Sequence, residues 1–248
     1  MLVEKALLPA ERETADPSRY FVSGELLVDR GQGRQFAVPG VPLLYLRVIP
    51  TTAGTQLRRA DAVDLIRQGP VHLDPLYYRQ SSVSFEPNEY GAIALAADYE
   101  RGLILAAAQL FLNREIWGFN ATLFDPNTSR KRGIPTLSVE QSLAVSLRKY
   151  LHFAESKLQL EPPFRIEAGA VGIKGYVIHM PSNFIESEWG PIQQHIVRWR
   201  GIISSTDPAS VDAALLAIFD EFFDAGGARR PSTLYSFPGT TPGATPKG

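Results

Sequence analysis

Three segments in the middle of this chain of 248 residues constrain its fold more than any other feature. Residues 106–120 (AAAQLFLNREIWGFN) have the pattern of two short strands joined by a turn, and residues 134–153 (IPTLSVEQSLAVSLRKYLHF) that of an amphipathic helix. Residues 160–176 (LEPPFRIEAGAVGIKGY) indicate another strand pair. None of the three has the spacing of a known catalytic or metal-binding motif. Packing therefore accounts for the most ordered part of the sequence.

Short apolar runs separated by turn residues predict strands along most of the chain. The predicted strands cover residues 21–28, 43–49, 91–97, 103–111, 116–123, 164–170 and 176–180, and residues 192–203 contain an alternating segment. A short helix is predicted over residues 59–68. Together these elements predict an α/β (α+β) fold: a mixed, largely antiparallel sheet with two main amphipathic helices packed on it.

The two main helices have recognisable start signals. Ser138 and Gln141 have the spacing of a capping box and predict a helix over residues 138–159. Asp207 followed by Pro208 predicts the start of the second helix, which Gly226–Gly227 ends. Apolar residues recur along one face of each helix, so both helices are expected to pack on the sheet.

Composition divides the chain into three parts. Residues 1–20 are polar and acidic and are predicted to form an N-terminal arm. Residues 21–228 carry all the predicted elements and are expected to form a single α/β domain. Residues 229–248 are rich in proline, glycine and threonine and predict a flexible tail.

The chain contains no cysteine, which excludes disulfides, thiolate nucleophiles and cysteine-ligated zinc or iron–sulfur sites. The N-terminal residues carry charges and lack the apolar core of a secretory signal. The longest apolar stretch, residues 102–112, is interrupted by Gln109 and is too short to span a bilayer. We therefore expect a cytoplasmic protein with no membrane contact.

Residue types that are common in catalytic and metal sites are present, but not at the spacing of a known motif of this kind. The four histidines are His72, His152, His179 and His195, and no two of them have the spacing of a metal-binding pair. No phosphate-binding loop or serine nucleophile elbow occurs. These observations favour a protein without cofactor or metal and without enzymatic activity. One alternative stays open, a hydrolase site built from His179 or His195 with a carboxylate.

Basic residues gather at two places, although the net charge of the whole chain is only −1. The first group lies in a loop before the long helix, the second in the alternating segment: Arg130, Lys131 and Arg132, then Arg198 and Arg200. On a strand, Arg198 and Arg200 point to one face and Trp199 to the other. These five residues are candidates for nucleic-acid contact. The competing interpretation is a solvated edge strand that its arginines protect from aggregation.

Several stretches resemble the region that follows the Schlafen/AlbA-type DNA- or ATP-binding domain in bacterial proteins. Residues 109–114 are similar to its "QLFRNG" turn, residues 134–136 to its "IPS" entry, and residues 172–176 to its "GVKGY" stretch. Glu161-Pro162-Pro163 matches "EPP", and residues 44–50 resemble its "LHLIP" strand. The resemblance covers roughly residues 43–180 and excludes the N-terminal domain that carries the family's nucleotide chemistry. It implies an accessory module, and no catalytic residue transfers from the family.

These observations favour a non-catalytic accessory or interaction module that binds a partner protein, in a bacterial defence or regulatory system. The first alternative is a nucleic-acid-binding subunit that uses the five basic residues. The second alternative is the hydrolase described above. The partner most expected is another protein chain, and the pattern of the sequence specifies no oligomeric state.

Overall fold

The computed structural model describes residues 28–29, 35–36, 42–52, 54–77, 83–88, 90–124, 132–179 and 190–231. The predicted N-terminal arm lies outside these residues, as does the predicted tail apart from residues 229–231. Arg230 at the start of that tail makes a two-pronged ion pair with Glu140, with both N···O distances 2.9 Å. Burial raises the pKa of Glu140, and the guanidinium of Arg230 opposes this shift.

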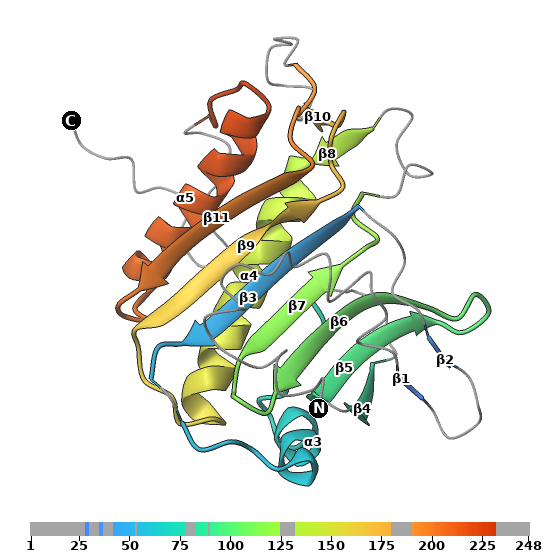
Figure 1. Ribbon diagram of the computed structural model, residues 1–248. Coiled ribbons are helices and arrows are strands. Elements are labelled where there is room, and N and C mark those ends of the chain that lie inside the picture. Colours follow the sequence, from blue (N-terminus) through green and yellow to red (C-terminus); the bar gives the residue numbers. More distant parts are fainter. Residues whose placement is uncertain are drawn as a thin grey trace, which may run out of the picture.

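A seven-stranded sheet forms the centre of the molecule (Figure 1), in the order β11-β9-β3-β7-β6-β5-β4. Every neighbouring pair in it is antiparallel. Its strands are β3 (Leu43–Pro50), β4 (Ser84–Asn88), β5 (Gly91–Asp98), β6 (Leu103–Phe111), β7 (Ile116–Asn120), β9 (Phe164–Val171) and β11 (Ile196–Ile203). The strands predicted over residues 91–97 and 103–111 are confirmed as β5 and β6, which pair in antiparallel orientation.

Two smaller sheets complete the strand inventory of the described residues. One pairs β1 (Val28–Asp29) with β2 (Gln35–Phe36) in antiparallel orientation. The other pairs β8 (Gly133–Pro135) with β10 (Val177–His179) in parallel orientation. The sheet content is therefore mixed and largely antiparallel, which confirms the predicted α/β (α+β) class.

Within the described ranges, three helices pack against the large sheet: α3 (Arg59–Arg67), α4 (Thr136–Ser156) and α5 (Pro208–Ala225). In Figure 1, α4 crosses behind β3 and β9, and α5 follows β11. The short helix α3 lies near β4, β5 and β6 at the lower end of the view. The two long helices are the two main amphipathic helices that the sequence predicts.

Both faces of the sheet are buried at its centre. This explains why the sequence of β3 is almost continuously apolar. Leu44, Leu46 and Val48 belong to the hydrophobic cluster that includes residues of α4 and α5. Tyr45 lies in a second cluster on the opposite face, together with Trp117 and Phe119. Because successive side chains of a strand point to opposite faces, a strand buried on both sides has no polar alternation.

The capping box predicted at Ser138 is wrong. Helix α4 begins at Thr136, directly after β8, so Ser138 lies inside the helix. The N-cap residue is Pro135, which makes no capping hydrogen bond through its side chain. The Thr136 hydroxyl donates to the carbonyl of His179 at 2.8 Å. The parallel pairing of β8 with β10 brings that carbonyl to the helix start. A contact between distant segments, invisible to local pattern, therefore sets the beginning of this helix.

The start predicted for the second helix is confirmed. Asp207 precedes α5, its carboxylate accepts a hydrogen bond from the backbone amide of Ser210 at 3.0 Å, and Pro208 is the first helical residue. Hydrogen bonding of the Asp207 carboxyl with Ser205, the largest cause, and with Ser210 lowers the pKa of this carboxyl. The helix ends at Gly226 and Gly227 as predicted.

The strands predicted over residues 164–170 and 176–180 both form, but they do not pair with each other. Strand β9 pairs with β3 and β11, whereas β10 pairs with β8. Gly172 and Gly175 adopt positive φ angles of 77° and 83° in the turn between them. After this turn, Val177 donates its amide hydrogen to the carbonyl of Arg132 at 2.8 Å. The chain is thereby diverted into the small parallel sheet.

Gly169 of β9 is a position where the sheet leaves no room for a side chain. An added Cβ atom would lie 2.0 Å from the carbonyl oxygen of Val197 and 3.1 Å from the hydroxyl oxygen of Tyr45. We predict that Gly169→Ala lowers the free energy of unfolding by about 1–3 kcal/mol, because the neighbouring backbone must shift. Urea denaturation measures this loss. The control Gly190→Ala places its Cβ where nothing lies within 4 Å, and an equal loss in both variants would contradict the prediction.

Candidate functional site

A row of charged and aromatic residues crosses four adjacent strands of the large sheet. Arg200 of β11 is in register with Glu167 of β9, which is in register with Arg47 of β3, and Arg47 is in register with Trp117 of β7. Residues in register on neighbouring strands point to the same face. Since Leu46 and Val48 face the helices, this row lies on the face away from α4.

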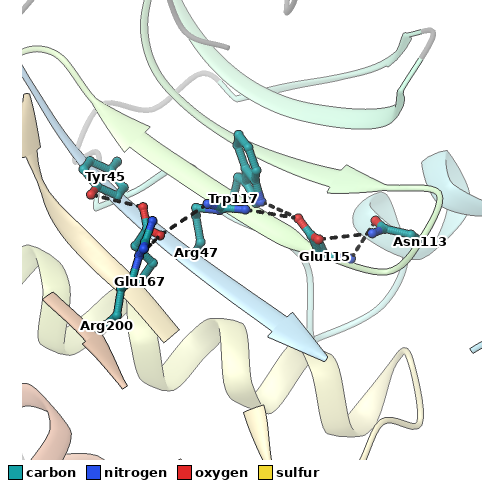
Figure 2. A network of polar contacts seen from close by, with 7 residues as sticks. All are labelled: Tyr45, Arg47, Asn113, Glu115, Trp117, Glu167 and Arg200. Atoms are coloured by element: carbon teal, nitrogen blue, oxygen red, sulfur yellow. Dashed lines mark hydrogen bonds and ion pairs between the residues drawn. The ribbon is translucent and has the colours of Figure 1, made fainter. Parts of the chain in front are cut away.

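Arg47 lies at the centre of the row and is only 1% exposed. Its guanidinium lies 4.0 Å from the centre of the Trp117 ring, a favourable cation–π distance. Its Nη1 atom is 3.4 Å from a carboxylate oxygen of Glu167, and its Nη2 atom is 3.7 Å from one of Glu115. Arg47 therefore lies between two carboxylates (Figure 2).

Glu115 is fixed by its own neighbours. Its Oε2 atom accepts a hydrogen bond from the indole nitrogen of Trp117 at 2.8 Å, and its Oε1 atom accepts one from the amide of Asn113 at 3.2 Å. Trp117 thus contacts both members of the Arg47–Glu115 pair. Each carboxylate oxygen of Glu115 therefore accepts a hydrogen bond, which lowers the cost of burying its charge.

Glu167 is the shared anion of the cluster and is 3% exposed. It accepts hydrogen bonds from the Tyr45 hydroxyl at 3.3 Å and from Nε of Arg200 at 2.8 Å. Nε of Arg198 lies 3.5 Å from the same carboxylate. With Arg47, three guanidiniums surround this one carboxylate. Burial, followed by the charge of Glu167, raises the pKa of Tyr45, so its hydroxyl stays a donor.

At the end of this cluster lies a hollow of about 300 Å³, which we call the arginine hollow. Its lining includes three arginines, one carboxylate and two exposed or half-buried isoleucines: Arg47, Arg165, Arg200, Glu167, Ile49 and Ile202. Arg165 lies on β9, on the same face as Glu167, and is in register with Ile49 of β3 and Ile202 of β11. The strand register therefore places the arginines and both isoleucines around one space.

Guanidinium groups that converge on a hollow favour an anionic ligand. Each guanidinium presents planar N–H donors that match a carboxylate or phosphate. The isoleucine walls favour an anion that carries an apolar neighbour. Among the described residues that line the arginine hollow there is no serine, threonine or histidine, and the shared chemistry of its arginines is the binding of an anion.

The sequence prediction for Arg198 and Arg200 can be compared directly with this geometry. Both arginines lie on β11 and contact Glu167 on the same face. Trp199 between them packs against the helix-side core, as alternation requires. Arg132 is exposed and precedes β8 of the small sheet. Arg130 and Lys131 lie outside the described residues, so a role of these five residues in nucleic-acid binding stays a prediction.

The four histidines do not contribute to the arginine hollow. His72, His152, His179 and His195 are all exposed, and none of them lines it. Across the ranges that the structure describes, no group of three histidine, aspartate or glutamate side chains is placed to hold a metal ion. The geometry thus adds no support to a hydrolase site at His179 or His195.

Sequence reasoning missed Tyr45, Arg47, Glu115, Arg165 and Glu167. A signal was nevertheless present, because Arg47 interrupts the apolar run LLYLRVI and Glu167 interrupts the predicted strand FRIEAGA. A lone charge inside a buried strand has to meet an opposite charge, since desolvation is otherwise too costly. This rule predicts that such residues pair, although it does not identify which pairs with which.

No family model, curated protein or solved structure matches this chain. The resemblance to the Schlafen/AlbA-associated region therefore stays a prediction. Among the helices that the structure describes, none combines the length and the apolar character needed to cross a membrane.

The shared carboxylate gives a prediction about stability. We expect Glu167→Gln to lower the free energy of unfolding by about 3–5 kcal/mol, because it removes the charge that three guanidiniums share in a buried setting. Denaturant unfolding measures the loss. Glu161→Gln is the matched control, since Glu161 is exposed and should stay within error of the parent protein. A Glu167→Gln variant as stable as the control would show that the cluster contributes nothing to folding.

The raised pKa of Tyr45 gives a prediction about alkaline pH. A tyrosine that stays protonated in the folded state but ionises near pH 10 when unfolded makes the protein less stable as pH rises through that value. Tyr45→Phe removes this contribution, so its urea midpoint should fall less steeply above about pH 10 than that of the parent. Tyr99→Phe, at an exposed tyrosine, should keep the parental slope. Equal slopes for all three proteins would contradict the prediction.

Proposed function

We propose that this protein is a non-catalytic binding module that holds an acidic segment of a partner protein in the arginine hollow. One observation carries the proposal: the described residues that line a single hollow of about 300 Å³ include three arginines and one carboxylate. The excess of positive charge favours an anionic occupant. The proposal makes the predicted interaction module concrete by naming the surface and the chemistry of its partner.

The arginines are preorganised for this role. Arg200 is fixed at its Nε atom by Glu167, while 48% of its side chain is exposed. Arg47 is held at the floor between Glu167 and Glu115. Side chains that are already ordered lose little conformational entropy when a ligand binds. The contacts within the cluster therefore support binding as well as folding.

The lining favours an acidic peptide over a nucleic acid. Ile49 and Ile202 form apolar walls, and Ile202 is 63% exposed. None of the described residues that line the hollow is aromatic, and these residues thus provide no stacking surface of the kind that single-strand binders use. Glu167 also places a negative charge in the floor. A peptide in which acidic and apolar residues alternate matches both the arginines and the isoleucines.

The resemblance to the Schlafen/AlbA-associated region supports the role of an accessory subunit. On that basis alone we propose that the module works in a bacterial defence or regulatory system, in the cytoplasm. The partner would then supply the chemistry, and this chain would supply recognition.

Fluorescence polarisation with defined probes tests the function. The probes are a labelled peptide of alternating glutamate and leucine, the same peptide with glutamine in place of glutamate, and a labelled oligothymidylate. We expect the full chain to bind the glutamate peptide in preference to the other two. Arg165→Glu should weaken that binding about tenfold or more, since it reverses one charge in the hollow.

The matched control for this experiment is Arg59→Glu, a charge reversal at an exposed arginine of α3. It should leave binding of the glutamate peptide unchanged. Equal binding of the glutamate and glutamine peptides would overturn the proposal. Tighter binding of the oligonucleotide, with a steep dependence on salt, would replace it by the nucleic-acid alternative.

A further inference from the structure

A second hollow, of about 260 Å³, lies between α4 and the segment before residue 78. Its lining includes polar side chains from two successive turns of the helix and from this segment: Asp74, Tyr77, Ser146, Lys149 and Tyr150, with Val145 beside them. We call it the Ser146 hollow. It shares no lining residue with the arginine hollow.

Ser146 is the most informative residue of this hollow, because it is buried at 2% exposure. Ser142 and Ser156 on the same helix donate their hydroxyl hydrogens to carbonyls four residues earlier. Ser146 differs, since its oxygen accepts a hydrogen bond from the Tyr77 amide at 3.1 Å. Within the described part of the chain, no acceptor takes its hydroxyl hydrogen. A buried donor of this kind is unfavourable unless something else accepts from it.

Lys149 supplies a second donor on the same face of α4. Its ammonium pairs with the carboxylate of Asp74, whose other oxygen is 2.9 Å from Nε2 of His72. The Tyr150 hydroxyl donates to the backbone carbonyl of Asp74 at 3.2 Å. An ammonium has three donors, so Lys149 can serve Asp74 and a ligand together. Both oxygens of Asp74 are already engaged, and the hollow thus offers mainly donors.

We propose that the Ser146 hollow binds a small carboxylate with a short branched apolar body. A carboxylate presents acceptors only, which complements the Ser146 hydroxyl and the Lys149 ammonium. Residues three apart on a helix lie on the same face, so both donors can reach one group. Val145 and Val83, which also line the hollow, provide apolar contact for the body of the ligand.

The site is a binding site and not a nucleophile. The sequence-based expectation that residues 134–153 contain no catalytic spacing is wrong in one respect, because Ser146 and Lys149 have the S-x-x-K spacing found in serine enzymes whose lysine is a candidate base. Here Lys149 pairs with the carboxylate of Asp74, and no hydrogen bond joins its side chain to the Ser146 hydroxyl among the described residues. The Ser146 oxygen also accepts from a backbone amide, which lowers its nucleophilicity. The inference is independent of the proposed function of the arginine hollow.

Isothermal titration of the full chain with isovalerate, and with isovaleramide as the uncharged isostere, tests this site. We expect isovalerate to bind more tightly than the amide. Ser146→Ala and Lys149→Met should each weaken isovalerate about tenfold, the usual effect of losing a hydrogen bond to a charged group. The controls Ser156→Ala and Lys174→Met change exposed residues of the same types and should leave the affinity unchanged.

Amide NMR of the unmodified protein keeps the test valid even where a variant folds poorly. Isovalerate should shift the amide signals of Tyr77 and Ser146. Shifts confined to β9 and β11 would place the carboxylate in the arginine hollow and overturn the inference. Absence of binding, or equal binding of isovalerate and isovaleramide, would also overturn it, because Ser146 would then be satisfied by water alone.

Discussion

The interaction on which the rest of this structure depends is the ion pair of Arg47 with Glu167 in the middle of the sheet. Both residues are almost fully buried, so neither charge is tolerable without the other. The pair joins β3 to β9, and through Arg200 and Trp117 it extends to β11 and β7. A slip of one residue in β3, β9 or β11 would turn a charge toward the helices. The cluster therefore specifies register as well as contributing stability.

The same cluster forms the binding surface that we propose for the sheet. Three guanidiniums on one face would repel one another, and Glu167 allows them to lie together. Glu115 supplies a second carboxylate to Arg47, so the cluster combines these three guanidiniums with two carboxylates. Gly169 contributes by its small size, since it leaves space for the Tyr45 hydroxyl and the backbone of Arg198. Folding and recognition thus use the same residues.

Local pattern identified most of the longer elements but not their connections. Short apolar runs, a turn glycine and the Asp207 cap identified β5, β6 and α5, because these signals lie within a few residues. The start of α4 depends on the carbonyl of His179, 43 residues away, so a local capping rule misplaced it. Arg47 and Glu167 are 120 residues apart, and their pairing follows only from the strand order β9-β3-β7. Each of the two residues is recognisable in the sequence as an isolated charge in an apolar strand, but the sequence does not show that they form a pair.

Strand β7 connects the two hollows through adjacent residues. Trp117 faces the cluster and lies against Arg47, whereas Gly118 faces α4 and leaves room for Tyr150, whose hydroxyl oxygen would be 2.2 Å from a Cβ atom there. The Tyr150 hydroxyl in turn reaches the carbonyl of Asp74. A side chain at Gly118 would displace the tyrosine ring and with it the wall of the Ser146 hollow. Because Gly118 of β7 lacks a side chain, it leaves space for the Tyr150 wall of the Ser146 hollow on the helix side. The adjacent residue, Trp117, contacts the charged cluster on the other face.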